Sequence, residues 1–342
     1  MTQRLLFALF ALFALFASTS TAAAQQYSSE LIFPPEQWHN HSSSIVELPN
    51  GDLLACWFHG SGERTADDVL INAARWNHTT RKWSAPFVLA DTPGFPETNP
   101  VLFLDSHQRL FFLWPLIIAH QWETALMKYR ISTDYQQASG PPKWEHQDNI
   151  VLIPRNILER TKEFVGDASS DRAKRMVEHA GDEYYSRMGW FTRTHPLELA
   201  SGRILVPMYS DGFSFGIMAI SDDGGYTWNA SEPIVGAGCV QPSVVRKNDG
   251  TLVAYLRDNG PPPKRAMISF SKDNGVTWTP ARDSELLNPG TSIEVVRLRD
   301  GKGSPCITTS KTAGIPSSPP SATMKEPPGN GAAIWTAVPT GR

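Results

Sequence analysis

Apolar strands separated by tight turns recur along this chain. The alternation of an apolar run, a turn and a second apolar run is found in residues 45–58 (IVELPNGDLLACWF), 101–114, 197–210 and 244–257. Asn-Gly, Ser-Gly and Asp-Gly dipeptides lie between several of these runs, and such dipeptides are typical of β-hairpin turns. A fifth copy begins at residues 295–301 (VVRLRDG). The pattern predicts an all-β chain built from repeated hairpins.

A second repeated element follows two of the hairpins. Residues 221–228 read SDDGGYTW, and residues 271–278, 50 positions later, read SKDNGVTW. In this S-x-D-x-G-x-T-W pattern the Asp can accept hydrogen bonds from its own turn, and the Gly can adopt positive φ. Shorter versions that keep the closing Trp end at Trp83 and Trp144. A mostly β repeat of about 50 residues indicates the blades of a β-propeller.

The pattern resembles the Asp box, or bacterial neuraminidase repeat, of the sialidase superfamily. The resemblance covers about residues 33–301 and implies a six-bladed, sialidase-like β-propeller. Four blades and part of a fifth are visible, so the propeller is expected to be incomplete at its C-terminal end. Asp boxes lie on the blade rim, and for this reason they indicate the fold rather than an activity.

One interval between hairpins is nearly two blades long. The excess falls at about residues 155–188, where the sequence is charged and has helical instead of alternating periodicity. It predicts a helical insertion between blades. The insertion either covers one face of the propeller or shapes a substrate cleft.

The composition changes after Gly301. Residues 302–342 are rich in Pro, Ser, Thr and Gly and lack strand alternation, which is typical of a disordered tail. Alternatively, reading the codons from Ser321 two bases later permits another Asp box, which indicates a shifted reading frame. The propeller would then be unclosed, and we expect little sialidase activity from the chain as written.

The N-terminus and the overall composition indicate an exported protein. Residues 1–24 have a basic start at Arg4, an apolar run over residues 5–17 and a small-residue cleavage site before Gln25, as in a signal peptide. Thirteen apolar residues are too few to span a bilayer. We therefore expect a secreted or periplasmic protein whose mature chain has no integral membrane segment. The formal net charge of −3 argues against a nucleic-acid partner.

The cysteines suggest neither a metal site nor a disulfide. Cys56 and Cys239 lie in apolar runs, where they are expected to pack as small hydrophobic side chains, and Cys306 lies in the tail. No spacing resembles a structural zinc site, and we expect neither a metal nor a cofactor.

The resemblance to sialidases also implies a set of site residues. Sialidases bind the sugar carboxylate with three arginines, because a guanidinium fork matches a carboxylate. Arg257, which ends a predicted inner strand, fits the second of these arginines. His41 stands where the first arginine is expected, and Gln241 stands where the family has the Glu that assists its Tyr nucleophile. Both are departures, since an amide cannot act as a base.

Candidates for the remaining roles lie in two other segments. Glu63, Arg64 and Asp68 belong to the segment after the first hairpin, where sialidases place their acid/base, and Glu63 and Asp68 are the catalytic candidates. Arg193 precedes the third hairpin and could bind substrate. A solvated, charged loop remains the alternative for the first three residues.

Two functions follow from these observations. The first is a secreted, sialidase-like glycoside hydrolase that acts on terminal acidic sugars of glycans. The alternative is a non-catalytic propeller that binds glycans or proteins, which the substitutions at His41 and Gln241 favour.

Overall fold

The computed structural model describes residues 30–297, 305–308 and 334–335. The chain divides into two units, with the boundary between Pro35 and Glu36, and all the strands and helices given below belong to the second unit. The predicted signal peptide and most of the predicted tail lie outside the described residues. None of the helices in the described segments is long and apolar enough to cross a membrane.

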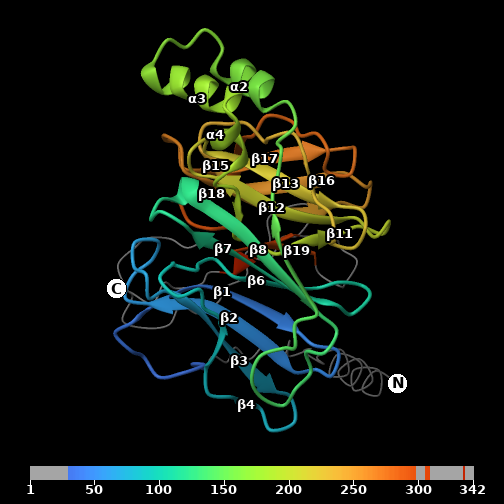
Figure 1. Ribbon diagram of the computed structural model, residues 1–342. Coiled ribbons are helices and arrows are strands. Elements are labelled where there is room, and N and C mark those ends of the chain that lie inside the picture. Colours follow the sequence, from blue (N-terminus) through green and yellow to red (C-terminus); the bar gives the residue numbers. More distant parts are fainter. Residues whose placement is uncertain (1–29, 298–304, 309–333, 336–342) are drawn as a thin grey trace, which may run out of the picture. The chain divides into compact units, whose positions relative to one another are not determined.

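Antiparallel strands are the main regular elements of the second unit, and in the described residues they form five sheets that follow one another along the chain (Figure 1). We call these sheets blades 1 to 5. Blade 1 comprises β1 (His39–Glu47), β2 (Leu53–Gly60), β3 (Leu70–Asn77), β4 (Lys82–Trp83) and β5 (Phe87–Ala90). Blade 2 comprises β6 (Val101–Leu104), β7 (Leu110–Ile117), β8 (Ala125–Ser132) and β9 (His146–Ile150).

The next two blades repeat this order. Blade 3 comprises β10 (Phe191–Thr192), β11 (Leu197–Glu198), β12 (Ile204–Ser210), β13 (Phe215–Ser221) and β14 (Asn229–Ala230). Blade 4 comprises β15 (Cys239–Arg246), β16 (Leu252–Asp258), β17 (Arg265–Ser271) and β18 (Arg282–Leu287). Blade 5 comprises β19 (Val295–Arg297), β20 (Pro305–Thr308) and β21 (Ile334–Trp335), the last of which pairs with β20 in parallel. The fold is a sialidase-like β-propeller, as predicted, and five of its six expected blades are seen in the described segments.

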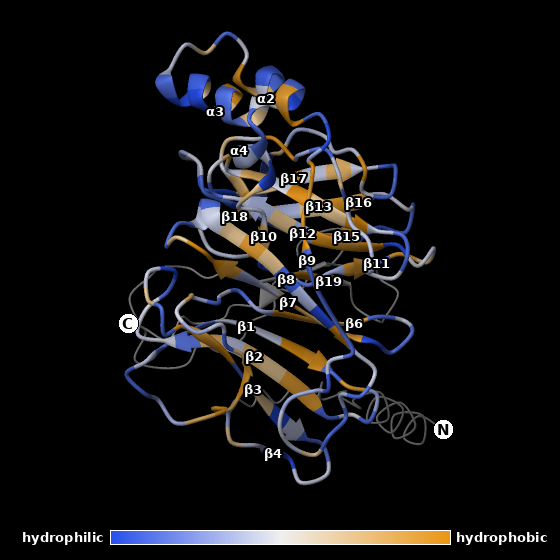
Figure 2. Cartoon of the chain, viewed as in Figure 1, coloured by the Kyte–Doolittle hydropathy of each residue, from blue (hydrophilic) through white to orange (hydrophobic). Residues whose placement is uncertain are grey.

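The predicted hairpins form the first two strands of blades 1, 2 and 4, and in blade 3 the hairpin is β11–β12. The β1–β2, β6–β7 and β15–β16 pairs all close on the turns that the sequence indicates. Every residue of β12 and β13 is buried, and Figure 2 shows apolar residues along both strands. Cys56 and Cys239 are buried free thiols, which confirms that they pack as small hydrophobic side chains. Burial raises the pKa of Cys56 well above its usual range.

The helical insertion lies between blades 2 and 3, as predicted. It contains α2 (Ile157–Val165), α3 (Asp171–Gly181) and α4 (Glu183–Arg187). Short polar caps start two of the helices: Ser170 accepts from the amide of Ala173, and Asp182 accepts from the amides after it. Arg160 on α2 donates to the carbonyl of Trp278, so the insertion is attached to blade 4.

The two Asp boxes close the turns after β13 and β17. In the first, Asp223 accepts hydrogen bonds from Ser221 Oγ (2.8 Å), the Tyr226 amide (3.1 Å) and both the amide (2.9 Å) and hydroxyl (2.6 Å) of Thr227. Asp273 makes the same set of bonds in the second box. These bonds all lie within one turn, which is why a short sequence pattern is enough to specify them.

Each Asp box also packs on the blade before it. Gly225 has φ +90°, and a Cβ there would lie 2.5 Å from Phe111 Cε1 of blade 2. Gly275 has φ +87°, and a Cβ there would lie 3.0 Å from Leu205 Cδ1 of blade 3. The box glycines are therefore required both for positive φ and for the close approach of neighbouring blades.

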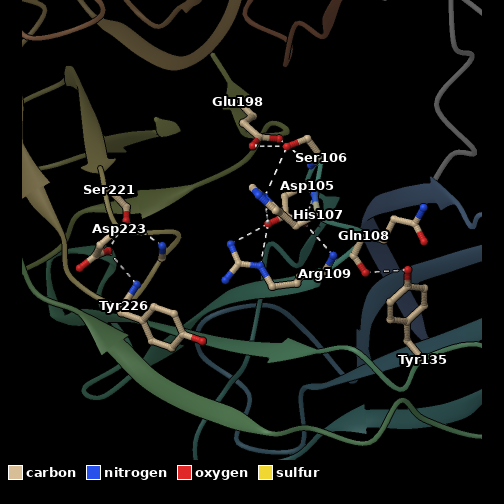
Figure 3. A network of polar contacts seen from close by, with 11 residues as sticks. Asp105, Ser106, His107, Gln108, Arg109, Tyr135, Glu198, Ser221, Asp223 and Tyr226 are labelled. Atoms are coloured by element: carbon tan, nitrogen blue, oxygen red, sulfur yellow. Dashed lines mark hydrogen bonds and ion pairs between the residues drawn. The ribbon is translucent and has the colours of Figure 1, made fainter. Parts of the chain in front are cut away.

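A polar network accompanies the contact between blades 2 and 3 (Figure 3). Asp105 holds the β6–β7 turn by accepting from the amide of Arg109 at 2.7 Å and pairing with its guanidinium at 2.7 Å. Ser106 donates from Oγ to Glu198 of β11 at 2.7 Å. The same guanidinium lies against Gly224, so the network joins the hairpin turn of blade 2 to the Asp box of blade 3.

The Asp box makes folding stability depend on pH. Although desolvation opposes it, hydrogen bonding from Thr227, Ser221 and Tyr226 lowers the pKa of Asp223 to about 2. An unfolded Asp has a pKa of about 3.9, so the stabilisation is complete above about pH 4 and is lost as pH falls towards 2. We expect Asp223→Asn to lower the thermal midpoint clearly at pH 6 and much less at pH 2.5, measured by circular dichroism.

An exposed aspartate supplies the control for this measurement. Asp283 lies on the outer strand β18, and Asp283→Asn is expected to leave the midpoint unchanged at both pH values. A constant difference between wild type and Asp223→Asn across this range would contradict the role of the ionised carboxylate.

Candidate active site

Inner strands of successive blades bring equivalent residues together. In the first strand of each hairpin, pairing ends at an equivalent residue: Glu47, Leu104, Glu198 or Arg246. The residues five positions before these four therefore share one register. The matching sequences VVRKNDG and VVRLRDG add blade 5 to this set. We call it the inner ring, and it consists of Ser42, Asn99, Arg193, Gln241 and Ser292.

Local backbone irregularity distinguishes this register. Ser42, Asn99 and Gln241 have positive φ values of 57°, 43° and 52°, and all three are buried. The register of β1 shifts between His41 and Ser44, and that of β15 shifts between Val240 and Ser243. Bulges and strained residues of this kind are frequent beside functional sites, where they direct side chains.

Arg193 contacts two other members of the inner ring and also His41, the neighbour of Ser42. Its guanidinium donates to Asn99 Oδ1 at 3.0 Å, to Ser292 Oγ at 3.3 Å and to His41 Nε2 at 3.4 Å. Loss of water around the His41 ring, followed by the positive charge of Arg193, lowers the pKa of His41 to about 4. His41 is therefore neutral at pH 7 and can accept the hydrogen bond from Arg193.

A second pair of residues occupies equivalent positions on the second strands. Tyr209 on β12 and Arg257 on β16 each lie five positions after the start of their strand. Gln241 Nε2 donates to Tyr209 Oη at 3.1 Å, whereas Gln241 Oε1 is buried without a hydrogen-bond partner in the described segments. Burial, with the nearby charge of Asp211, raises the pKa of Tyr209.

Arg257 has no hydrogen-bond or ion-pair partner among the described residues, and its Nε atom is buried. Its charge nevertheless acts on His41, Arg193, Tyr209 and Asp211. A partly buried guanidinium without a partner is costly, and such groups are common in ligand sites. The positions of these residues indicate that an anion could bind here.

Charged side chains from the loop after β2 reach the same place. The charge of Glu63 acts on both Arg193 and Asp211, and that of Arg64 acts on Asp211. The Arg64 guanidinium also lies 5.4 Å from the ring centre of Trp122. Asp68 differs, since it is exposed and its carboxylate accepts from the hydroxyl of Ser61 at 2.8 Å and from its amide.

The structure therefore brings six of the seven predicted site residues into one cluster. These six are His41, Glu63, Arg64, Arg193, Gln241 and Arg257, and Asp68 lies in the same loop as Glu63 and Arg64. We call this group, with Tyr209, Asp211 and Glu123, the central cluster. Sequence reasoning missed the last three. A signal was present for two of them, because Tyr209 is equivalent in register to Arg257 and Asp211 follows it by two residues.

A hydrogen-bonded triplet lies two positions further along the inner strands. His195 of blade 3 contacts Glu294 of blade 5 through a short hydrogen bond, and Ser243 of blade 4 donates to the same carboxylate oxygen at 2.9 Å. Burial opposes the charged imidazole, but the Glu294 carboxylate outweighs it and raises the pKa of His195. The triplet supports the inner ring by joining three blades.

Two surface cavities lie away from the central cluster. One, of about 420 Å³, lies on α2 and α3 beside Lys162, Val165 and Val177. The other, of about 460 Å³, lies between the first hairpin turns of blades 2 and 3 beside Ser106, His107 and Glu198. Neither contains a predicted site residue, and the unpaired charges of the central cluster carry the stronger chemical indication.

Comparison with known proteins agrees with this architecture. The sequence matches the BNR repeat-like domain over residues 51–159 and 172–312. No curated protein matches the chain significantly in sequence. A protein of unknown function from Dyadobacter fermentans is similar in structure, with 17% identity over 78% of this chain and 74% of that one, at a TM-score of 0.57.

Sialidases are among the other similar structures. The NanB sialidase from Streptococcus pneumoniae is 12% identical over 81% of this chain, with a TM-score of 0.56, and the match spans 58% of that sialidase. The intramolecular trans-sialidase from Ruminococcus gnavus is 13% identical over 79% of this chain and 76% of its own, with a TM-score of 0.55. At these identities the similarity establishes the fold.

Proposed function

Because the chain belongs to the BNR repeat-like domain family, we propose that it is a secreted or periplasmic, sialidase-like glycoside hydrolase acting on terminal acidic sugars of glycans. The observation that carries the proposal is the unpaired guanidinium of Arg257 within the central cluster. A planar fork of N–H donors matches a sugar carboxylate, and the surrounding charges offer proton-transfer groups.

Each of the seven predicted site residues has a defined part in the proposed reaction. Arg257 binds the substrate carboxylate, and Arg193 adds positive charge while it holds the inner ring in position. Glu63, whose charge acts on Arg193, is the acid/base candidate predicted from the sequence, and Asp68 is the second candidate in the same loop. His41, Gln241 and Arg64 contact the sugar from the edges of the site.

A second candidate function is a propeller that binds acidic glycans without cleaving them. Gln241 favours it, because this residue stands where sialidases are expected to have a Glu and its amide donates to Tyr209. An amide cannot accept the proton that an assisting carboxylate would take. The two candidates share the same ligand class and differ only in turnover.

A substrate panel separates the two functions. We expect the protein to release sugar only slowly from 4-nitrophenyl glycosides of sialic acid or of hexuronic acids, since little sialidase activity is predicted for this chain, and to leave the matching neutral galactoside intact. Release is followed by absorbance of the nitrophenolate, and binding of the free sugars by calorimetry. Binding of an acidic sugar without release would favour the non-catalytic propeller, and preference for the neutral sugar would contradict both.

A further inference from the structure

Asp211 is a carboxyl group of the central cluster without a partner. It directly follows β12, two residues after Tyr209, and its side chain is half-buried. Among the described residues 30–297 this carboxylate has no hydrogen-bond or ion-pair partner. Only the charges of nearby side chains act on it at longer range. Leaving a partly buried carboxylate unpaired costs stability, so its retention points to a chemical role.

Charged groups from three other segments act on Asp211. Arg257 comes from β16, Glu63 and Arg64 come from the loop after β2, and Glu123 comes from the 3-10 helix Trp122–Thr124. Two residues before Asp211, Tyr209 has a pKa raised by burial and also by the charge of Asp211. Asp211 therefore lies where blades 1, 2, 3 and 4 meet at the central cluster.

Two glycines allow Glu123 to approach Asp211. A Cβ on Gly189 would lie 2.7 Å from the Glu123 Cα, and a Cβ on Gly212, the residue after Asp211, would lie 3.2 Å from the Glu123 Cγ. The backbone of the 3-10 helix thus lies directly against the segments around α4 and β12. This close packing places a second carboxylate beside Asp211 and opposes its ionisation.

The environment leaves Asp211 able to carry a proton near neutral pH. Burial raises the pKa of Asp211 to about 6, with Glu123 and Glu63 acting in the same direction and Arg257 and Arg64 opposing them. A general acid works best when its pKa is close to the working pH. By contrast, the exposed Asp68 carboxylate is held by the hydroxyl and amide of Ser61.

We propose that Asp211, in place of Glu63 or Asp68, is the proton donor for the departing glycosidic oxygen, a role that rests on the proposed hydrolase function. The Asp211 carboxyl gives its proton to that oxygen as the bond to the anomeric carbon breaks, and the bonding electron pair remains on the oxygen. The aglycone leaves as an alcohol. Water then adds to the anomeric carbon, and the proton it loses restores the acid form of Asp211, so one water is the only other reactant.

Substrates with different leaving groups test this role. A 4-nitrophenolate leaves without protonation, whereas an alkyl alcohol needs a proton. We expect Asp211→Asn to lower kcat/KM for the alkyl glycoside of the acidic sugar by about 10²–10⁴-fold, and for its 4-nitrophenyl glycoside by less than about 10-fold. The control Asp249→Asn, in the exposed β15–β16 turn, is expected to change neither value.

The pH profile gives a second readout. In the wild type, kcat/KM for the alkyl glycoside should fall as pH rises through about 6, because the acid form of Asp211 is lost. This fall should be missing in Asp211→Asn, whose thermal midpoint should be no lower than that of the wild type. Equal losses on both glycosides, or an unchanged profile, would overturn the assignment of Asp211.

The proposed function can fail separately from this role. A wild type that cleaves the acidic glycosides while Asp211→Asn retains full activity on the alkyl glycoside would overturn the role of Asp211 alone. A wild type that binds the acidic sugars but cleaves none of them would overturn hydrolysis, and Asp211 as its proton donor with it.

Discussion

Replacing Arg257 with alanine is expected to weaken the binding of a carboxylated sugar by on the order of 10²–10³-fold, because a charged hydrogen-bonding partner in a partly buried site is lost. Within the described segments the Arg257 guanidinium has no protein partner, so it is available to bind the ligand. For the matching sugar with a neutral amide in place of its carboxylate, the affinity should fall by less than about 3-fold. Calorimetry with the two ligands measures both effects.

Two further variants sharpen this test. Arg257→Lys retains the positive charge but lacks the planar fork, and an intermediate loss is expected. Arg265→Ala, on the neighbouring strand β17, removes an arginine whose side chain donates to the carbonyl of Glu285, and it should leave the affinity unchanged. An equal loss for the carboxylated and the neutral ligand would rule out carboxylate recognition by Arg257.

The second large effect concerns stability. Gly225→Ala is expected to lower the free energy of unfolding by about 2–5 kcal/mol, since the new Cβ suffers both positive φ and overlap with the Phe111 ring. The ring is buried, at 1% exposure, so it has little room to move aside. Denaturant unfolding followed by tryptophan fluorescence measures the loss.

Other glycines with similar φ separate the two causes. Gly202 has φ +84° with no atom within 4 Å of a new Cβ, and Gly202→Ala should cost only about 1–2 kcal/mol for its conformation. Gly275→Ala meets the more flexible Leu205 side chain, and its loss should fall between the other two. If alanine lowered the free energy of unfolding equally at Gly202 and Gly225, packing between blades would contribute nothing to the cost at Gly225.

The fold could be predicted because its signals are local. Each Asp box is held by bonds within one turn, such as those of Asp223, and each hairpin carries its own turn dipeptide. The insertion was expected at about residues 155–188, and its helices run from Ile157 to Arg187. Such features depend on residues a few positions apart, so a single sequence contains them in full.

The candidate site could be predicted only in part, because it is assembled across blades. Arg257 and Glu63 were found through their positions in a known repeat. Asp211 and Glu123 were missed, since nothing in their neighbouring residues shows that they meet. Only the register of the hairpins, in which Tyr209 is equivalent to Arg257, relates Asp211 to the cluster.

The packing of each Asp box on the preceding blade has a consequence for synthesis on the ribosome. Phe111 is made before Gly225, and Leu205 before Gly275, so the surface that receives each box is always translated first. Each of these two boxes can therefore dock on the blade before it as soon as its own turn emerges. For these two contacts, the order of translation permits the same order of assembly.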